Sequence, residues 1–252
     1  MPLPKPFYRI IRPFPDGEYL APSTGDERVY ILSNDYSPDR SVLIRAYTLI
    51  ERDLIELFDY IEPCDANLPT YSHRTYELLL RASTEFETNC KGILHANGYT
   101  RPAGGNLDVT DYYKIEKASR LSEYQVILNA WHPIRKIFEP FKEWATGQPL
   151  RWYRSYNTVK HNRSMHFPEA SLENVMASIT ALFAILFSQY YSFALNRYHN
   201  IGDYTVDDDG SIHDDSSLFS IITPSSWSSN EQYDFDWNVV RATPNPIDKF
   251  SF

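Results

Sequence analysis

Residues 168–197 read PEASLENVMASITALFAILFSQYYSFALNR, and this stretch decides the fold. Pro168, Glu169 and Glu173 suit the start of a helix, where proline fits the first turn and carboxylates meet the positive end of the dipole. No charged residue follows until Arg197, so the run is long enough to cross a membrane. It is interrupted, however, by six polar residues: Asn174, Ser178, Thr180, Ser188, Gln189 and Ser192. No second segment resembles it, so we predict the central core helix of a soluble bundle rather than a membrane span.

Other helices are predicted on the N-terminal side of this stretch. Apolar residues recur at steps of three and four in two long segments and two shorter ones, which indicates helices that each bury one face. The four segments are residues 39–61, 71–97, 108–121 and 150–162. Pro63 ends the first helix, and Asn97-Gly98 ends the second.

The remaining segments lack helical periodicity. Residues 1–40 are rich in Pro, Asp, Ser and Tyr, so we expect an extended arm with a short strand at residues 28–32. Residues 124–131 fit either a strand or an extended connector, and residues 133–144 form a short amphipathic stretch broken by a proline. In residues 204–213 an Asp-Gly turn separates two short apolar segments, which predicts a hairpin.

These segments together predict a mainly α protein in three parts. Residues 1–39 form the extended N-terminal arm, residues 40–197 an antiparallel helical bundle, and residues 198–252 a small acidic, partly β C-terminal appendage. The composition, 42% hydrophobic and 23% charged, excludes wholesale disorder.

Cysteine usage and the first residues predict a cytoplasmic protein. Cys64 and Cys90 form neither a disulfide framework nor a metal-ligand pattern, so we expect free thiols in a reducing compartment. The start of the chain carries no apolar run that would indicate a signal peptide. The histidines have no carboxylate or cysteine spacing typical of zinc, so we expect neither a metal nor another cofactor.

Charge is distributed unevenly along the chain. The net charge of −9 argues against an indiscriminate nucleic-acid binder. From Tyr198 to Phe252, ten acidic residues face only Arg241 and Lys249, which leaves −8. From Trp144 to Pro168 there is no acidic residue and there are four basic ones, which gives +4. An acidic tail therefore coexists with a basic centre.

The basic centre contains the candidate catalytic residues. Residues 151–163 read RWYRSYNTVKHNR, and Arg154 and His161 are seven apart, so two helical turns place them on one face with Asn157 between them. A guanidinium can clamp phosphate oxygens with two hydrogen bonds, and an imidazole can move a proton to or from a ribose 2′-oxygen. Arg154, His161 and Asn157 therefore suit phosphodiester chemistry.

Neighbouring residues suit RNA binding. Arg151, Lys160 and Arg163 add attraction for phosphates, and Tyr156 offers a ring that can stack on unpaired bases, as do Trp152 and Tyr153. The alternative interpretation is structural, with His161 a core histidine satisfied by a carboxylate and Arg154 an ion-pair partner. Glu85 and Glu87 lie two apart on a helix and cannot face the same way, so they are not a paired acid and base.

The stretch Tyr156-Asn157-Thr158-Val159-Lys160-His161-Asn162-Arg163, followed by residues 171–183 (SLENVMASITALF), resembles the closing half of a HEPN-type domain. Residues 78–91 (LLLRASTEFETNCK) also resemble the second helix of these domains. HEPN domains are helical bundles common in prokaryotic toxin–antitoxin, abortive-infection and other phage-defence proteins. The resemblance covers roughly residues 40–197.

The resemblance implies an activity and partners. Active family members carry an Arg, four to six residues and then a His, and are metal-independent endoribonucleases; here six residues separate Arg154 from His161. By resemblance, His161 acts as acid or base or aligns the 2′-hydroxyl, and Arg154 stabilises the phosphorane. Two such motifs usually meet across a homodimer. Ser155 departs from the family pattern, because active members often have Asn, Asp or His at that position.

Two further expectations concern function. Many HEPN-like domains are non-catalytic RNA-binding or dimerising modules, which is the alternative function for this chain. An antitoxin or another defence-system protein is the expected protein partner besides a second copy. From charge alone, the acidic tail is predicted to cover the basic site of its own or a partner chain as an RNA mimic.

Overall fold

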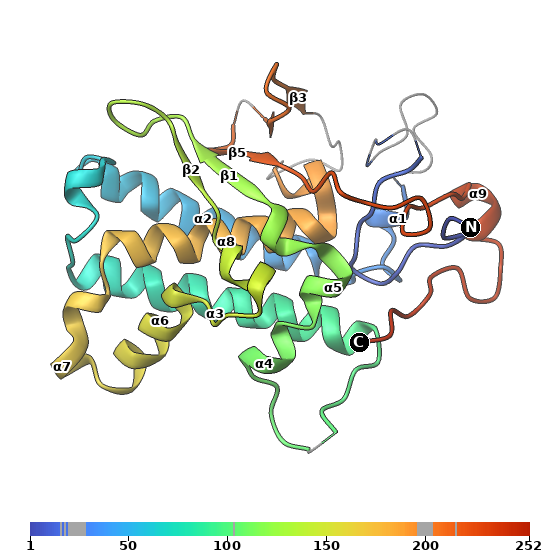
Figure 1. The fold of residues 1–252 in the computed structure, drawn as a ribbon, viewed down its shortest axis with the longest axis horizontal. Helices are drawn as coiled ribbons and strands as arrows, with labels where there is room; N and C mark the ends of the chain where they lie inside the picture. Colours follow the sequence, from blue (N-terminus) through green and yellow to red (C-terminus); the bar gives the residue numbers. More distant parts are fainter. Residues whose placement is uncertain (16, 18, 20–28, 103, 196–203, 215) are drawn as a thin grey trace.

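The computed structural model describes residues 1–252 except 16, 18, 20–28, 103, 196–203 and 215. The described part is mixed but helix-rich, with a small antiparallel sheet against the helices (Figure 1). The longer helices are α2 (Arg40–Phe58), α3 (His73–Ala96), α6 (Arg151–His161) and α8 (Leu172–Tyr190). The shorter ones are α1 (Val29–Leu32), α4 (Val109–Tyr112), α5 (Ile115–Ser119), α7 (Arg163–His166) and α9 (Trp237–Val240). The strands are β1 (Gln125–Leu128), β2 (Lys136–Phe138), β3 (Thr205–Val206), β4 (Ile212–His213) and β5 (Phe219–Ile222).

Helix α8 is the central core helix, as the sequence predicts. Its side chains are buried on all sides except near its start, and α2, α3, α6 and β1 all pack against it. Among the described residues, α8 with its C-terminal extension to Ala194 is the one helix apolar and long enough to cross a membrane. Because surrounding elements cover it, its apolar character is explained by the core of a soluble fold.

Helices α2 and α3 confirm the predicted periodicity. Each buries one face, and their bounds fall within three residues of the expected ends. Ser72 begins α3 with a capping box, in which the Ser72 hydroxyl accepts from Thr75 N at 3.2 Å and Thr75 Oγ1 accepts from Ser72 N at 2.7 Å. Gly98 follows the end of α3 with φ +77°, a conformation that glycine adopts without strain.

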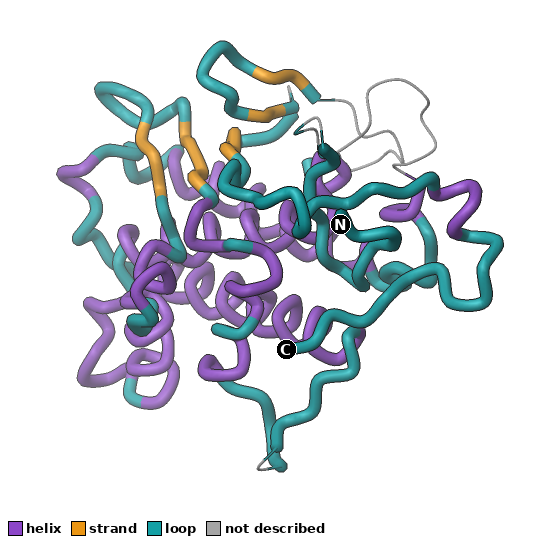
Figure 2. Tube along the Cα trace, turned by 45° about the vertical axis from the view of Figure 1, so that its right-hand side comes forward, coloured by secondary structure: helices purple, strands orange, loops and turns teal. Residues whose placement is uncertain are grey.

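The sheet joins segments that lie far apart in the sequence. Its strand order is β2-β1-β5-β4-β3, with every neighbouring pair antiparallel. Strand β5 of the tail pairs with β1 of the centre, so that Val126 lies opposite Ile221. The predicted hairpin is confirmed as β3 and β4, where Thr205 lies opposite His213. Figure 2 shows the strands lying together over the helices.

The N-terminal arm and the tail are interlocked. Leu3 N donates to Gln232 O at 2.8 Å. The Tyr233 hydroxyl donates to Ile10 O at 2.8 Å and accepts from Phe7 N at 3.0 Å. Buried side chains from the arm, the centre and the tail belong to one continuous hydrophobic core. The division of the chain into an arm, a bundle and an appendage, with boundaries after residues 39 and 197, stays a prediction.

Two local predictions need correction, and a third segment, predicted only as an amphipathic stretch, gains a strand. Residues 29–32 form helix α1 rather than a strand, because one helical turn lets the neighbours Tyr30 and Ile31 both enter the core, whereas a strand would send them to opposite faces. Residues 108–121 form two short helices rather than one. Within residues 133–144, β2 forms by pairing with β1, so that Phe138 lies opposite Val126.

Candidate functional site

Helix α6 is held by its buried face. Trp152, Tyr153, Tyr156 and Val159 recur at helical spacing and are all buried. Trp152 Nε1 donates to Pro140 O at 2.9 Å, and its ring meets that of Phe86 on α3 edge to face at 5.2 Å. These contacts fix the rotation of α6 about its axis, and thereby fix which residues face solvent.

The predicted catalytic residues lie on the opposite face of α6. Arg154 and His161 are exposed, and Asn157 between them is half-buried. Within the described part of the chain, no group lies within hydrogen-bond or ion-pair distance of these three side chains. Among the described residues, therefore, His161 is not a core histidine and Arg154 has no ion-pair partner.

Spacing along α6 determines what one copy can present. Arg154 and His161 are separated by two helical turns, which corresponds to about 10 Å along the axis. One chain therefore presents a row of a cation, an amide and an imidazole rather than a closed cluster.

The predicted phosphate-binding residues lie around this row, and each side chain makes a different contact with its neighbours. Arg151 is 88% exposed, with Nε 3.7 Å from Glu143 Oε1. Lys160 Nζ donates to the Tyr156 hydroxyl at 2.9 Å, and this hydrogen bond raises the pKa of Lys160. The Arg163 guanidinium lies over the ring of Tyr76, 5.5 Å from its centroid. All three side chains keep their charge in contact with solvent.

The stacking role predicted for Tyr156 is wrong. Its ring is 1% exposed and packs against Tyr153 at 5.5 Å, so neither face is open to a base. Trp152 and Tyr153 are buried too. Tyr153 donates to Glu87 Oε1 at 2.9 Å, and burial beside this carboxylate raises its pKa.

An aromatic cluster that sequence reasoning missed lies beyond the C-terminal end of α6. The ring of Phe167 is 5.0 Å from His73, 5.5 Å from Tyr71 and 6.2 Å from Tyr76. Tyr71 is 47% exposed, so this cluster offers the ring surface that Tyr156 does not. No local signal indicates it, because the rings come from segments some ninety residues apart.

Glu85 and Glu87, the two carboxylates that are too poorly aligned to act as a paired acid and base, have different surroundings on α3. Glu87 accepts from Tyr153 and pairs with Lys91 Nζ at 3.3 Å. Glu85 is half-buried on α3, and burial raises the pKa of its carboxyl. Neither forms an ion pair or a hydrogen bond with Arg154 or His161. The described residues include no group of three His, Cys, Asp or Glu side chains placed to hold a metal ion.

The described part of the acidic tail lies away from α6. Asp209 pairs with Arg135 at 2.6 Å beside the β1–β2 turn, and Glu231 pairs with Arg120 at 2.9 Å. Figure 1 shows β3 at the top of the molecule and α6 and α7 at the lower left. In these described residues the tail does not cover the basic row of its own chain; coverage of a partner chain stays a prediction.

The comparisons with known proteins add no family to this description. No protein-family model, no curated protein and no solved structure matches the chain.

Proposed function

We propose that this chain is a metal-independent endoribonuclease built on a HEPN-like bundle, acting in a prokaryotic defence or toxin-type system. The observation that supports it most is the row on α6. Arg154, Asn157 and His161 lie on the face of α6 opposite its buried side, and no described residue forms a hydrogen bond or an ion pair with their side chains. Buried polar groups are normally satisfied within the fold, whereas this row has no described partner and is accessible to a ligand from solvent.

The proposed reaction uses the 2′-hydroxyl of RNA as the nucleophile. The 2′-oxygen attacks the adjacent phosphorus, and the bond from phosphorus to the 5′-oxygen breaks. The products are a 2′,3′-cyclic phosphate and a free 5′-hydroxyl. His161 accepts the proton of the 2′-hydroxyl and delivers it to the leaving 5′-oxygen, and Arg154 stabilises the charge on the phosphorane. Asn157 donates an amide hydrogen bond to a phosphate oxygen.

Binding of RNA follows from the same surface. Arg151, Lys160 and Arg163 supply positive charge on both sides of the row. Because one copy presents the catalytic groups in a line, a homodimer that brings two rows together would concentrate them on one phosphate. Unpaired bases would stack on Tyr71 and its aromatic neighbours rather than on Tyr156.

The test is incubation of the purified protein with total cellular RNA in EDTA. Wild type is compared with the Arg154→Ala/His161→Ala variant and with Arg45→Ala/His95→Ala, which removes an exposed Arg and an exposed His elsewhere. We expect wild type and the control to produce cyclic phosphate ends, and the α6 variant to produce none. Equal cleavage by all three proteins would contradict the assignment of the site.

One observation favours a second function, that of a non-catalytic RNA-binding or dimerising module. Met165 on α7, close to the row, is 74% exposed, and exposed methionines are common at adaptable binding surfaces. For a module of this kind, the incubation would show no cleavage. A filter-binding assay would then show that the protein retains RNA. Loss of that binding in the α6 variant would then identify the row as the contact surface.

A further inference from the structure

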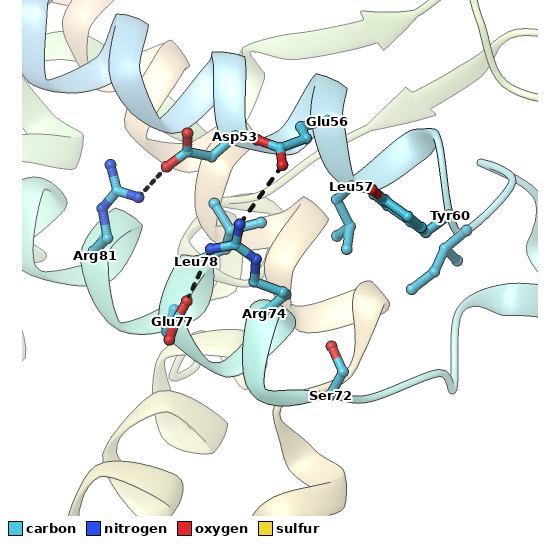
Figure 3. Close-up of a pocket in the computed structure, with 10 residues that line it drawn as sticks. Asp53, Glu56, Leu57, Tyr60, Ser72, Arg74, Glu77, Leu78 and Arg81 are labelled. Carbon is cyan, nitrogen blue, oxygen red and sulfur yellow. Dashed lines mark hydrogen bonds and ion pairs between the residues drawn. The ribbon is translucent and has the colours of Figure 1, made fainter.

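A cavity of about 360 Å³ lies between α2 and α3 (Figure 3). Helix α6 lies on the other side of α3 (Figure 1). The cavity is lined by the charged residues Asp53, Glu56, Arg74, Glu77 and Arg81, and by apolar side chains from both helices. Its volume is within the range of small-molecule sites. Nothing in the proposed ribonuclease reaction uses it.

The cavity has an apolar part beside a charged part. Leu57 and Leu78 are buried at 6% and 3% exposure and form its floor. Tyr60 stands at the open end and is 81% exposed. Figure 3 shows Arg81, Asp53, Glu77 and Arg74 on one side, Leu57 and Tyr60 on the other, and Glu56 between them. A ligand that fits both parts has an apolar body and one charged group.

The ion pairs in the charged part of the cavity indicate whether the charged group of the ligand is positive or negative. Arg81 pairs with Asp53, which also lies 3.8 Å from Arg52 outside the cavity. Arg74 is shared by two carboxylates, with nitrogens 3.7 Å from Glu56 Oε1 and 3.4 Å from Glu77 Oε2. The lining thus carries three carboxylates and two guanidiniums, a surplus of one negative charge, which attracts a cation and repels an anion. A cation would satisfy the second carboxylate beside Arg74.

Tyr60 also favours a positively charged group on the ligand. Its ring is free of aromatic or cationic contacts with other described residues, so its face is open at the mouth of the cavity. The negative face of an aromatic ring attracts a cation within about 6 Å, and desolvation by apolar neighbours strengthens the attraction. The surplus carboxylate and the exposed ring are thus two separate observations that indicate a positively charged ligand.

We propose that this α2–α3 cavity binds a small organic cation with an apolar body, of the alkylammonium or arylalkylammonium class. The apolar body lies on Leu57 and Leu78. The ammonium group lies between the Tyr60 ring and the carboxylate of Glu56, and Glu77, on the far side of Arg74, adds to the negative charge of the lining. The site is independent of the row on α6, so its occupancy is measured without reference to RNA cleavage.

The experiment is an amide NMR titration of the full chain with phenethylammonium, with neutral phenethyl alcohol and anionic phenylacetate as matched probes. Binding is compared in wild type, in Glu56→Gln/Glu77→Gln and in Asp59→Asn/Glu62→Gln. The last variant makes the same charge change at exposed positions that do not line the cavity. The side chains of Glu56 and Glu77 are each 56% exposed, so replacing them with glutamine leaves the fold intact.

We expect saturable shifts at amides around the cavity, with phenethylammonium about fivefold tighter than phenethyl alcohol. The Glu56→Gln/Glu77→Gln variant should raise its Kd by about fivefold, and the control by less than about twofold. Tyr60→Leu keeps an apolar side chain and should weaken the cation more than the alcohol. Phenylacetate binding as tightly as the cation, an equal Kd in the two charge variants, or no saturable shift at the cavity would each overturn the proposal.

Discussion

The outward face of α6 and the interior around Arg9 both carry a guanidinium and an amide, in opposite environments. Arg9 is 5% exposed; its Nε donates to Gln189 Oε1 at 2.9 Å and its Nη2 to the Tyr190 hydroxyl at 3.1 Å. The Gln189 amide in turn donates to Asn89 Oδ1 at 2.9 Å. The side chain of Arg154 has no such partner among the described residues.

This difference separates polar residues that stabilise the fold from those available to a ligand. A buried polar group costs free energy unless it is hydrogen-bonded, so the groups around Arg9 depend on one another. An exposed group without a partner contributes little to stability. The two regions therefore predict opposite responses to substitution, which the following measurements test.

The largest effect on stability is expected on α6 itself, two residues from Arg154. Tyr156→Ala should lower the free energy of unfolding by about 3–5 kcal/mol, because it leaves a cavity in the core. Arg154→Ala should change it by no more than about 0.5 kcal/mol. Urea unfolding followed by circular dichroism measures both. A Tyr156→Ala variant as stable as wild type would show that this ring is not part of the core.

A smaller loss is expected at Arg9. Arg9→Met should lower the free energy of unfolding by about 2–4 kcal/mol, since Gln189 and Tyr190 lose a buried donor. The control is Arg45→Met, which changes an exposed guanidinium on α2 and should be nearly neutral. If the two substitutions had equal effects, burial and pairing would not be what distinguishes the regions.

The smallest effect is expected at the exposed pair between Asp209 and Arg135. Hydrogen bonds from Ser211, followed by the contact with Arg135, lower the pKa of Asp209 to about 2 from 3.8. The pKa of Asp209 is lower in the folded state than in the unfolded state. Its hydrogen bonds and ion pair therefore stabilise docking of the β3–β4 hairpin above about pH 4, and this stabilisation is lost as the pH falls through about 2. Arg135→Ala should raise the titration midpoint of the Asp209 carboxyl in a carbon-13 NMR titration. A midpoint that Arg135→Ala leaves unchanged would show that the pair does not form in solution.

Much of the helical part of the fold follows from local pattern. The apolar spacing in residues 39–61, 71–97 and 150–162, together with the apolar run after residue 171, predicts α2, α3, α6 and α8. The pairing of β1 with β5 cannot be predicted from local pattern. Val126 lies opposite Ile221 although α8 comes between them in the sequence, and the sequence of neither strand indicates its partner. Helix α1 was missed because a single turn of four residues has too few positions to show a period.

The candidate site could be predicted in part. Helical spacing places Arg154 and His161 on one face, but only the packing of the other face shows that they are exposed. The burial of Tyr156 was visible in the sequence, since Trp152, Tyr156 and Val159 recur at steps of four and three. The ring cluster around Phe167 depends on the packing of α3 against the segment after α7, which no local pattern shows.

The most direct test of the central claim is the single-turnover cleavage rate of a labelled single-stranded RNA by His161→Ala and by His95→Ala. Both histidines are exposed, so both variants should keep the wild-type free energy of unfolding. We expect His161→Ala to be slower than wild type by about 100-fold or more, as for loss of a general acid or base, and His95→Ala to lie within about twofold. Equal rates in the two variants, or no cleavage by wild type, would contradict the account.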